Sequence, residues 1–157
     1  MELILLCGIP TCGKSTYVNN LITQPRYADA VVLSTDNYIQ RVADEQGKTY
    51  DDVFKKTISE ATDYMWERLK FAIFEQRHII IDQTNLTPKT RKQKTSKVPA
   101  DMYRKKAVYF EITLKEALER NKHREGKCIP EGVLKTMYHS FVIPNNTEDF
   151  EVIERGN

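Results

Sequence analysis

The sequence predicts an α/β fold of three layers, in which helices cover both faces of a mostly parallel sheet of about five strands. Two observations carry this prediction. Short apolar runs alternate with longer helical segments along the chain, and the apolar runs are continuous. Continuous runs are typical of parallel strands buried on both faces, and right-handed crossovers connect such strands. The length fits one domain, residues 1–157, with room for a buried core.

Five segments are the expected strands. Each is too short for a helix of about ten residues or more. The first four are rich in Ile, Val, Leu or aromatic side chains, and the fifth is weaker. They are Leu3–Cys7, Ala30–Leu33, His78–Ile81, Ala107–Ile112 and Phe150–Ile153.

Helix signals fall between these strands. Thr87 followed by Pro88 combines a hydroxyl N-cap with proline at the first helical position. Thr113 and Glu116 have the spacing of a capping box. Three of the expected helices have only a start, at Lys14, Thr87 and Thr113. Two others cover about Tyr50–Gln76 and about Glu131–Ser140.

The composition is that of a cytoplasmic protein with no membrane partner. The hydrophobic share of 40% and the charged share of 29% are ordinary for a globular chain. No apolar stretch approaches the roughly 18 residues of a membrane helix, and the N-terminal apolar run lacks the features of a secretion signal. The three cysteines are odd in number and form no paired motif, which favours reduced thiols.

A glycine-rich segment between the first strand and the first helix carries the strongest signal. Gly8-Ile9-Pro10-Thr11-Cys12-Gly13-Lys14-Ser15 matches the P-loop pattern G-x-x-x-x-G-K-[ST]. Its backbone amides and the following helix N-terminus suit phosphate oxygens. Lys14 would serve the β- and γ-phosphates, and the Ser15 hydroxyl would coordinate Mg²⁺. The expected ATP-binding residues are Gly8, Ile9, Pro10, Thr11, Cys12, Gly13, Lys14, Ser15 and Thr16.

Two aspartates follow expected strands. Asp36 comes after the second strand, and Asp82 closes the third in a Walker-B arrangement. Because the carboxyl ends of parallel strands face the ligand crevice, Asp36 is a candidate general base and Asp82 a candidate Mg²⁺ ligand. The alternatives are a helix N-cap for Asp36 and a turn residue for Asp82. Thr84 and Asn85 follow in the same loop and are candidate substrate-binding residues, which would orient either a phosphate or the loop itself.

Arginines near the C-terminal part predict a short helical lid over about residues 120–130. Arg120 and Arg124 are four residues apart, so they share one helix face. Phosphoryl transfer in P-loop proteins needs cationic stabilisation of the transferring group. Arg124 is therefore a candidate catalytic residue, and both arginines are candidate ATP ligands; the alternative is ordinary surface arginines.

The segment Lys89–Lys106 is strongly basic, with eight basic residues against one acid. It follows the Asp82 loop, so one interpretation is a track for a nucleic-acid backbone. Such a track would make binding depend on salt. The other interpretation is a solvated helix face. The substrate-binding candidates in this segment are Lys89, Arg91 and Lys92.

In these motifs the chain resembles the kinase domain of polynucleotide 5′-hydroxyl kinases. The motifs that align in order are Gly8 to Thr16, Asp36 to Tyr38, Asp82-Gln83-Thr84-Asn85, and Arg120 through Arg124 followed by Pro130. The resemblance implies a single kinase domain with ATP as donor and Mg²⁺ as cofactor. It also implies Asp36 as general base, Arg124 as lid arginine and the 5′-hydroxyl of DNA or RNA as acceptor.

Two positions depart from the phage-type members of that group. Three residues after the catalytic aspartate they carry an arginine that contacts substrate phosphate, whereas this chain has Ile39; Arg41 is the nearest candidate replacement. Gln83 stands where they carry a carboxylate, directly before the Thr-Asn pair. The Asp-x-Asp-Gly-Thr motif of the phosphatase partner domain is absent, so we expect a kinase alone.

Two other functions remain open at this point. The first is a P-loop kinase for another hydroxyl, on a hydroxymethylated base in DNA, a tRNA-linked group, a nucleoside or a small metabolite. The second is a nucleotide-dependent RNA-binding module that transfers no phosphate. Asp36, Asp82 and Arg124 together argue against the second function, because binding alone does not need a base.

Overall fold

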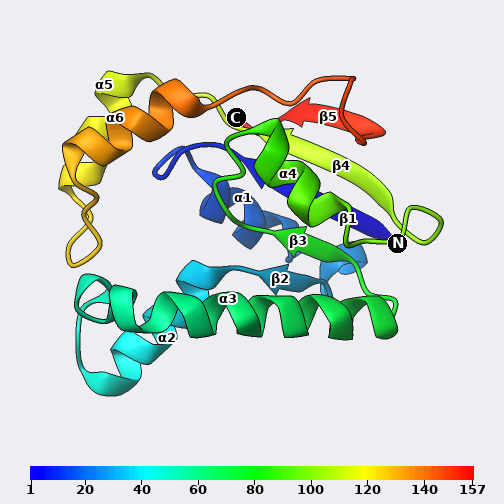
Figure 1. Cartoon of the computed structure of the whole chain (residues 1–157), viewed down its shortest axis with the longest axis horizontal. Helices are drawn as coiled ribbons and strands as arrows, with labels where there is room; N and C mark the ends of the chain where they lie inside the picture. The colour runs from blue at the N-terminus through cyan, green and yellow to red at the C-terminus, as the bar shows by residue number, and fades with distance from the viewer.

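A five-stranded sheet with all neighbours parallel forms the centre of the computed structural model, which describes residues 1–157 (Figure 1). The strand order is β2-β3-β1-β4-β5, so the first strand lies in the middle. The strands are β1 (Glu2–Cys7), β2 (Val31–Leu33), β3 (Ile79–Ile81), β4 (Arg104–Tyr109) and β5 (Val152–Arg155). The predicted fold class is confirmed.

Helices connect these strands, and side-chain caps explain several of their starts. The Thr87 hydroxyl accepts from the Thr90 amide, and the Thr113 hydroxyl accepts from the Glu116 amide, which confirms both predicted N-caps. No helix is both long enough and apolar enough to cross a membrane. The helices are α1 (Lys14–Leu21), α2 (Thr35–Gln46), α3 (Tyr50–Phe74), α4 (Pro88–Thr95), α5 (Leu114–Lys122) and α6 (Glu131–Ser140), with a 3-10 turn at Pro25–Tyr27.

The side chains of β1 alternate between two core layers. Leu5 points to the layer that contains Leu69 of α3, and Leu6 points to the layer that contains Val18 of α1. The second layer also receives side chains of α5 and α6. All six residues of β1 are buried, and each fully buried aliphatic side chain contributes about 1.5–3 kcal/mol. The central strand therefore holds the phosphate loop on a rigid base.

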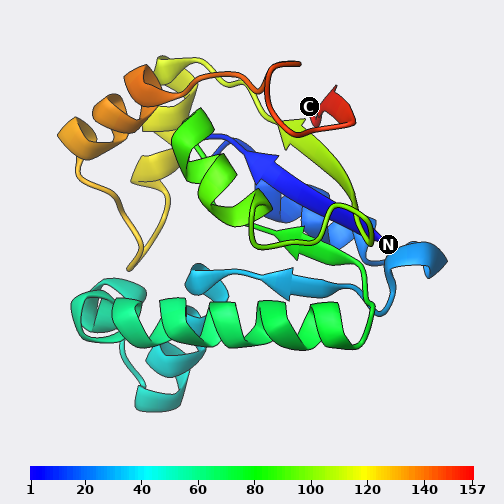
Figure 2. The ribbon, with the colours of Figure 1, turned by 45° about the vertical axis from the view of Figure 1, so that its right-hand side comes forward.

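Helices α2 and α3 form a hairpin with a small core of its own. Ile39 and Ala43 of α2 pack against Val53 and Ala61 of α3. Helix α3 has 25 residues and so is about 37 Å long. Its N-terminal end and α2 lie below the loop between α5 and α6 (Figures 1 and 2). This arrangement leaves the carboxyl ends of the strands between the hairpin and that loop.

Strand β4 begins earlier than the expected Ala107–Ile112. It pairs with β1 along its whole length, from Glu2 opposite Arg104 to Cys7 opposite Tyr109. The basic residues at its start therefore belong to the sheet. Two of them pair with acids near or within β5: Arg104 with Glu151 at 3.5 Å, and Lys106 with Glu154 at 2.6 Å.

Candidate active site

The phosphate loop runs from Gly8 to Gly13 and is held by close backbone packing. A Cβ on Gly8 would lie 2.7 Å from the Cys12 sulfur, and Gly13 has φ of 104°, so both positions favour glycine. The Gly8 amide donates to the Thr84 carbonyl at 2.8 Å. This bond joins the loop after β1 to the loop after β3.

Lys14 and Arg120 both donate hydrogen bonds to backbone carbonyls of this loop. The Lys14 ammonium is buried and donates to the carbonyls of Gly8 at 2.9 Å and Ile9 at 2.8 Å. Arg120, from the end of α5, donates to the Thr11 carbonyl at 3.0 Å and pairs with Glu116. The loop therefore carries two cations where phosphates would bind.

A cleft of about 560 Å³ opens above this loop. Its lining residues come from α1 to α5, from the loops after β1, β2 and β3, and from the segment after α5. Polar and charged side chains predominate among its walls, and two apolar ones, Phe54 and Ile58, come from α3. The other lining residues are Pro10, Thr11, Gly13, Lys14, Ser15, Thr16, Ser34, Thr35, Asp36, Asn37, Asp82, Gln83, Thr84, Lys94, Arg120, Arg124 and Lys127.

Asp36 lies in the first turn of α2, and it is not the helix cap. The cap is Ser34, whose hydroxyl accepts from the Asn37 amide at 3.3 Å. The Asp36 carboxylate is half-exposed in the cleft. It accepts a hydrogen bond from the Tyr50 hydroxyl at 2.8 Å and lies 3.4 Å from the Lys127 ammonium. The carboxylate is thus free of the helix terminus and oriented by two side chains.

Tyr50 and Lys127 were not expected at this site. Burial raises the pKa of the Tyr50 hydroxyl, and the Asp36 charge raises it further, so the hydroxyl stays protonated and donates. The Lys127 ammonium also lies 4.4 Å from the centre of the Tyr50 ring, a cation–π contact. Sequence patterns give no sign of this cluster, because its members come from α2, α3 and the lid.

Asp82 lies directly after β3, at the floor of the same cleft. Its amide donates to the Leu33 carbonyl at 2.9 Å, which fixes the turn. Burial raises the pKa of its carboxyl, and the charge of Asp36 adds to that effect, while Lys14 lowers it. Asp82, Asp36 and Lys14 therefore share one electrostatic environment.

The lid is shorter and less helical than expected. Helix α5 ends at Lys122 and α6 begins at Glu131, so most of the predicted 120–130 segment is loop. Gly126, with φ of 65°, packs against Thr49 at the start of α3, and its carbonyl accepts from the Asp51 amide at 3.0 Å. The lid therefore closes the cleft on the α3 side.

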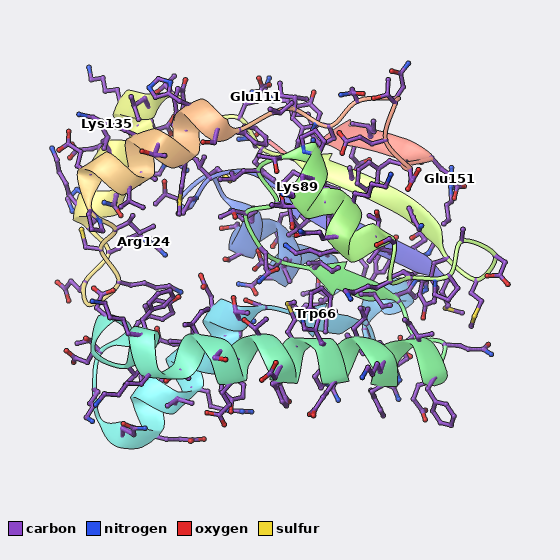
Figure 3. The ribbon with its side chains drawn as sticks, viewed as in Figure 1. Trp66, Lys89, Glu111, Arg124, Lys135 and Glu151 are labelled. Atoms are coloured by element: carbon purple, nitrogen blue, oxygen red, sulfur yellow. The ribbon has the colours of Figure 1, made fainter.

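Arg124 points from this lid toward the cleft (Figure 3). Its Nη1 is buried and has no hydrogen-bond partner in the protein. An unpaired buried guanidinium nitrogen is costly, so this donor fits an anionic ligand. The position agrees with the predicted lid arginine, whose catalytic role stays a prediction.

The Thr84–Asn85 pair divides into two roles. Thr84 lines the cleft, whereas Asn85 is 1% exposed and has φ of 47°. Its amide donates to the Leu6 carbonyl at 2.6 Å, and its side-chain oxygen accepts from Lys94. Asn85 therefore has the second of its two expected roles: its side chain orients the loop and does not line the cleft. Lys94 was not expected, and it lines the cleft beside this pair.

The basic segment does not form one continuous face. Arg91 is fully buried, with a two-bond ion pair to Glu148, both at 2.7 Å. It also donates to the carbonyls of Asn85 and Val142. The expectation that Arg91 binds substrate is therefore wrong, because its donors tie α4 to the C-terminal segment.

Other members of the segment also point in different directions. Lys97 lies 5.0 Å from the centre of the Trp66 ring. Lys89 is exposed on α4 (Figure 3), and Lys92 of the same helix is also exposed. Neither interpretation of the segment, track or solvated face, describes it as a whole. Arg41 lies outside the cleft and stacks on Tyr38, with 4.8 Å from its guanidinium carbon to the ring centre.

These residues fit a nucleotide with Mg²⁺. The loop amides, Lys14 and the unpaired Arg124 nitrogen suit phosphate oxygens. No group of three or more His, Cys, Asp or Glu side chains could hold a metal by itself. Mg²⁺ is usually held by one or two carboxylates together with phosphates. Ser15 and Asp82 both line the cleft, and their role as metal ligands stays a prediction.

Comparison with known proteins agrees with this geometry. A family model described as an AAA domain matches residues 3–144. L-seryl-tRNA(Sec) kinase from Methanococcus maripaludis is 26% identical over 144 residues, which cover 90% of this chain and 53% of that protein. The chain thus spans about half the length of this curated relative.

Solved structures share the fold at low identity. A candidate kinase from Chloroflexus aurantiacus has a TM-score of 0.69 at 15% identity, covering 98% of this chain and 86% of that one. Chaetomium thermophilum Kti12 in complex with ADP-AlF3 gives 0.57 at 15%, covering 98% and 88%. Shikimate kinase from Aquifex aeolicus gives 0.55 at 18%, covering 99% and 88%. At these identities the likeness concerns the fold alone.

Proposed function

This chain belongs to the AAA domain family, and on that premise we propose that it is an ATP-dependent kinase for a hydroxyl carried by a nucleic acid. The first acceptor we propose is the 5′-hydroxyl of a polynucleotide. The observation that carries the proposal is the position of Asp36, a carboxylate that caps no helix and faces the phosphate loop across one cleft.

The side chains of the cleft divide the work of phosphoryl transfer. Bound ATP with Mg²⁺ supplies the phosphoryl group and part of the charge neutralisation. Lys14 and Arg124 stabilise negative charge on the phosphate oxygens. Asp36 accepts the proton of the attacking hydroxyl, and the Tyr50 hydroxyl and Lys127 ammonium hold its carboxylate in place. Asp82 and Ser15, which both line the cleft, would hold the metal.

The charge of the cleft supports an anionic acceptor. Five cationic side chains face two carboxylates, Asp36 and Asp82. ATP with Mg²⁺ uses part of that excess, and an acceptor with a phosphate backbone would use the rest. The cations are Lys14, Lys94, Arg120, Arg124 and Lys127.

A second candidate acceptor is a hydroxyl on a tRNA-linked group. The relative from M. maripaludis is named L-seryl-tRNA(Sec) kinase, so a hydroxyl attached to a nucleic acid is also the acceptor in that name. The apolar wall of Phe54 and Ile58 next to Asp36 suits either a sugar or an amino-acid side chain.

Phosphate transfer from labelled ATP to a matched panel of acceptors tests the proposal. The panel holds DNA and RNA oligonucleotides with a 5′-hydroxyl, the same oligonucleotides with a 5′-phosphate, seryl-tRNA and free nucleosides. We expect label on 5′-hydroxyl oligonucleotides and none on the 5′-phosphorylated controls. Label on seryl-tRNA alone would favour the second candidate. Label on free nucleosides alone, or on no acceptor, would contradict a nucleic-acid hydroxyl.

A further inference from the structure

A second hollow lies between α2 and α3, beside the cleft. It has a volume of about 330 Å³ and contains two arginines and two tyrosines. The Tyr38 and Tyr64 rings are 4.9 Å apart, and the Arg41 guanidinium carbon lies 4.8 Å and 5.5 Å from their centres. Arg68 lines the same hollow. We call these four residues the Tyr–Arg groove.

The groove joins the cleft on the side of Asp36. Ser34 and Asn37 line both hollows, and Asp36 lies between them in the first turn of α2. The phosphate loop contributes no residue to the groove. An occupant of the groove would therefore lie next to the acceptor hydroxyl and away from ATP.

The two arginines of the groove have few partners within the protein. Arg41 has one acidic partner, Glu45, at 3.9 Å, and both side chains are more than half exposed. Arg68 takes part in none of the ion pairs of the protein. Its guanidinium carbon lies 4.7 Å from the centre of the Phe71 ring. A guanidinium stacked on a ring keeps its edge free for the bidentate recognition of phosphate.

One of the two tyrosines is partly accessible to a ligand. Tyr64 is 39% exposed, whereas the Tyr38 hydroxyl is held by Glu60 at 2.5 Å. Stacking of a base on an aromatic ring beside a cationic groove is the common mode of single-strand binding. A small uncharged acceptor would need neither the arginines nor the ring.

We propose that the Tyr–Arg groove binds the nucleotide that follows the acceptor end of a single strand. Its base stacks on Tyr64, and its backbone phosphate pairs with Arg41 and Arg68. This inference rests on the proposed function and adds the subsite that distinguishes a polynucleotide from a nucleoside.

Charge removal in the groove tests the inference. The double variant Arg41→Gln/Arg68→Gln should raise KM for a 5′-hydroxyl single strand about tenfold and leave kcat and KM for ATP within twofold. The salt dependence should fall by about 0.7 log units per lost phosphate contact. Tyr64→Leu should raise the same KM about fivefold or more without changing the salt dependence. Anisotropy of a labelled oligonucleotide measures the same loss without turnover.

The matched control is Lys115→Gln/Lys135→Gln, which removes two exposed cations on α5 and α6. These helices lie across the molecule from α2 and α3 (Figures 1 and 3). We expect the control to match the wild type. Nucleoside acceptors, which lack the second nucleotide, should show no difference between any of the proteins.

Two results would overturn the inference, and they differ from each other. If the wild type phosphorylates oligonucleotides and the groove variants do so with unchanged KM and salt dependence, the groove has no part in binding and the proposed function stands. If the wild type neither phosphorylates nor binds oligonucleotides, the polynucleotide acceptor fails and the groove assignment fails with it.

Discussion

The donor side and the acceptor side of the cleft are built in different ways. The donor side is a run of consecutive residues, Gly8–Ser15, in which backbone conformation does most of the work. The acceptor side brings Asp36, Tyr50 and Lys127 together from α2, α3 and the lid, at 2.8 and 3.4 Å. A function carried by a local backbone shape leaves a motif in the sequence. A function carried by side chains from three separate segments does not.

Asp36→Asn should have the largest effect and tests the acceptor side. We expect turnover to fall by about 10²–10⁴, the usual contribution of a general base, while ATP affinity stays within a few-fold. Steady-state kinetics with a 5′-hydroxyl oligonucleotide, together with equilibrium binding of ATP, measures the two quantities. Asp44→Asn is the matched control, because Asp44 is an exposed carboxylate of the same helix. A loss below tenfold would remove Asp36 from the catalytic role.

Lys14→Ala should have the next largest effect and tests the donor side. Removal of one preorganised cation from the phosphates should lower turnover by about 10²–10³ or more. The ammonium bonds only to loop carbonyls and the Cys12 sulfur, so circular dichroism should show a folded protein. Lys135→Ala, on exposed α6, is the control. Normal transfer by folded Lys14→Ala protein would contradict the donor site.

The fold was predictable because each of its signals is local. The β-α alternation, the hydroxyl caps at Thr87 and Thr113, and the glycine loop each depend on a few neighbouring residues. Pairing between strands changes mainly the residues at which a predicted strand begins and ends. Strand β4 starts at Arg104 because β1 offers it six partners, and an apolar pattern contains no such information.

The candidate site was predictable only in part, and Arg91 gives the reason. A run of lysines and arginines is normally exposed, but Arg91 is buried against Glu148, 57 residues further along the chain. The burial of Asn85 depends in the same way on the carbonyl of Leu6, 79 residues earlier. Neither partner can be identified from spacing, so both side chains were expected to face a substrate.

Arg91→Met tests whether Arg91 of α4, once a candidate substrate ligand, has a structural role. Loss of one partner of a buried ion pair leaves the Glu148 charge uncompensated and should cost about 3–5 kcal/mol of unfolding free energy. Urea denaturation measures the change. The neighbouring variant Lys92→Met should stay within about 0.5 kcal/mol, because Lys92 is exposed. Equal stability of the two variants would mean that the Arg91–Glu148 pair does not hold α4 to the C-terminal segment.

Lys94→Gln should have a smaller effect, and it tests a cation that lines the cleft and donates to Asn85. Burial lowers the pKa of the Lys94 ammonium to about 8, so the charge is present at neutral pH and is lost as pH rises through about 8. We expect kcat/KM for ATP to decline over that range in the wild type. The variant should be about tenfold less active at pH 7 and should lack the decline.

The stability of the protein should respond to Lys94 in the opposite direction. Since the folded state holds this proton less tightly than the unfolded state, the free energy of unfolding should rise with pH between about 8 and the ordinary value of 10.5. Denaturation at several pH values measures this rise, which Lys94→Gln should reduce. If wild type and variant follow the same pH profiles for activity and stability, Lys94 does not titrate as the burial implies.

Lys89→Gln/Lys92→Gln should have the smallest effect and gives the sharpest contrast within the acceptor side. Of the candidate residues in the basic segment, only these two lysines remain exposed. They line a hollow together with Asp149, whose negative charge offsets part of theirs. We therefore expect less than a twofold change in KM for a 5′-hydroxyl oligonucleotide and almost no change in its salt dependence. The variant Arg41→Gln/Arg68→Gln removes the same number of charges from the Tyr–Arg groove. In the same measurements it should change KM for the oligonucleotide about tenfold. A larger change in KM and salt dependence for the lysine pair would mean that the nucleic-acid strand passes along α4. A lost phosphate contact must lower the salt dependence wherever it occurs.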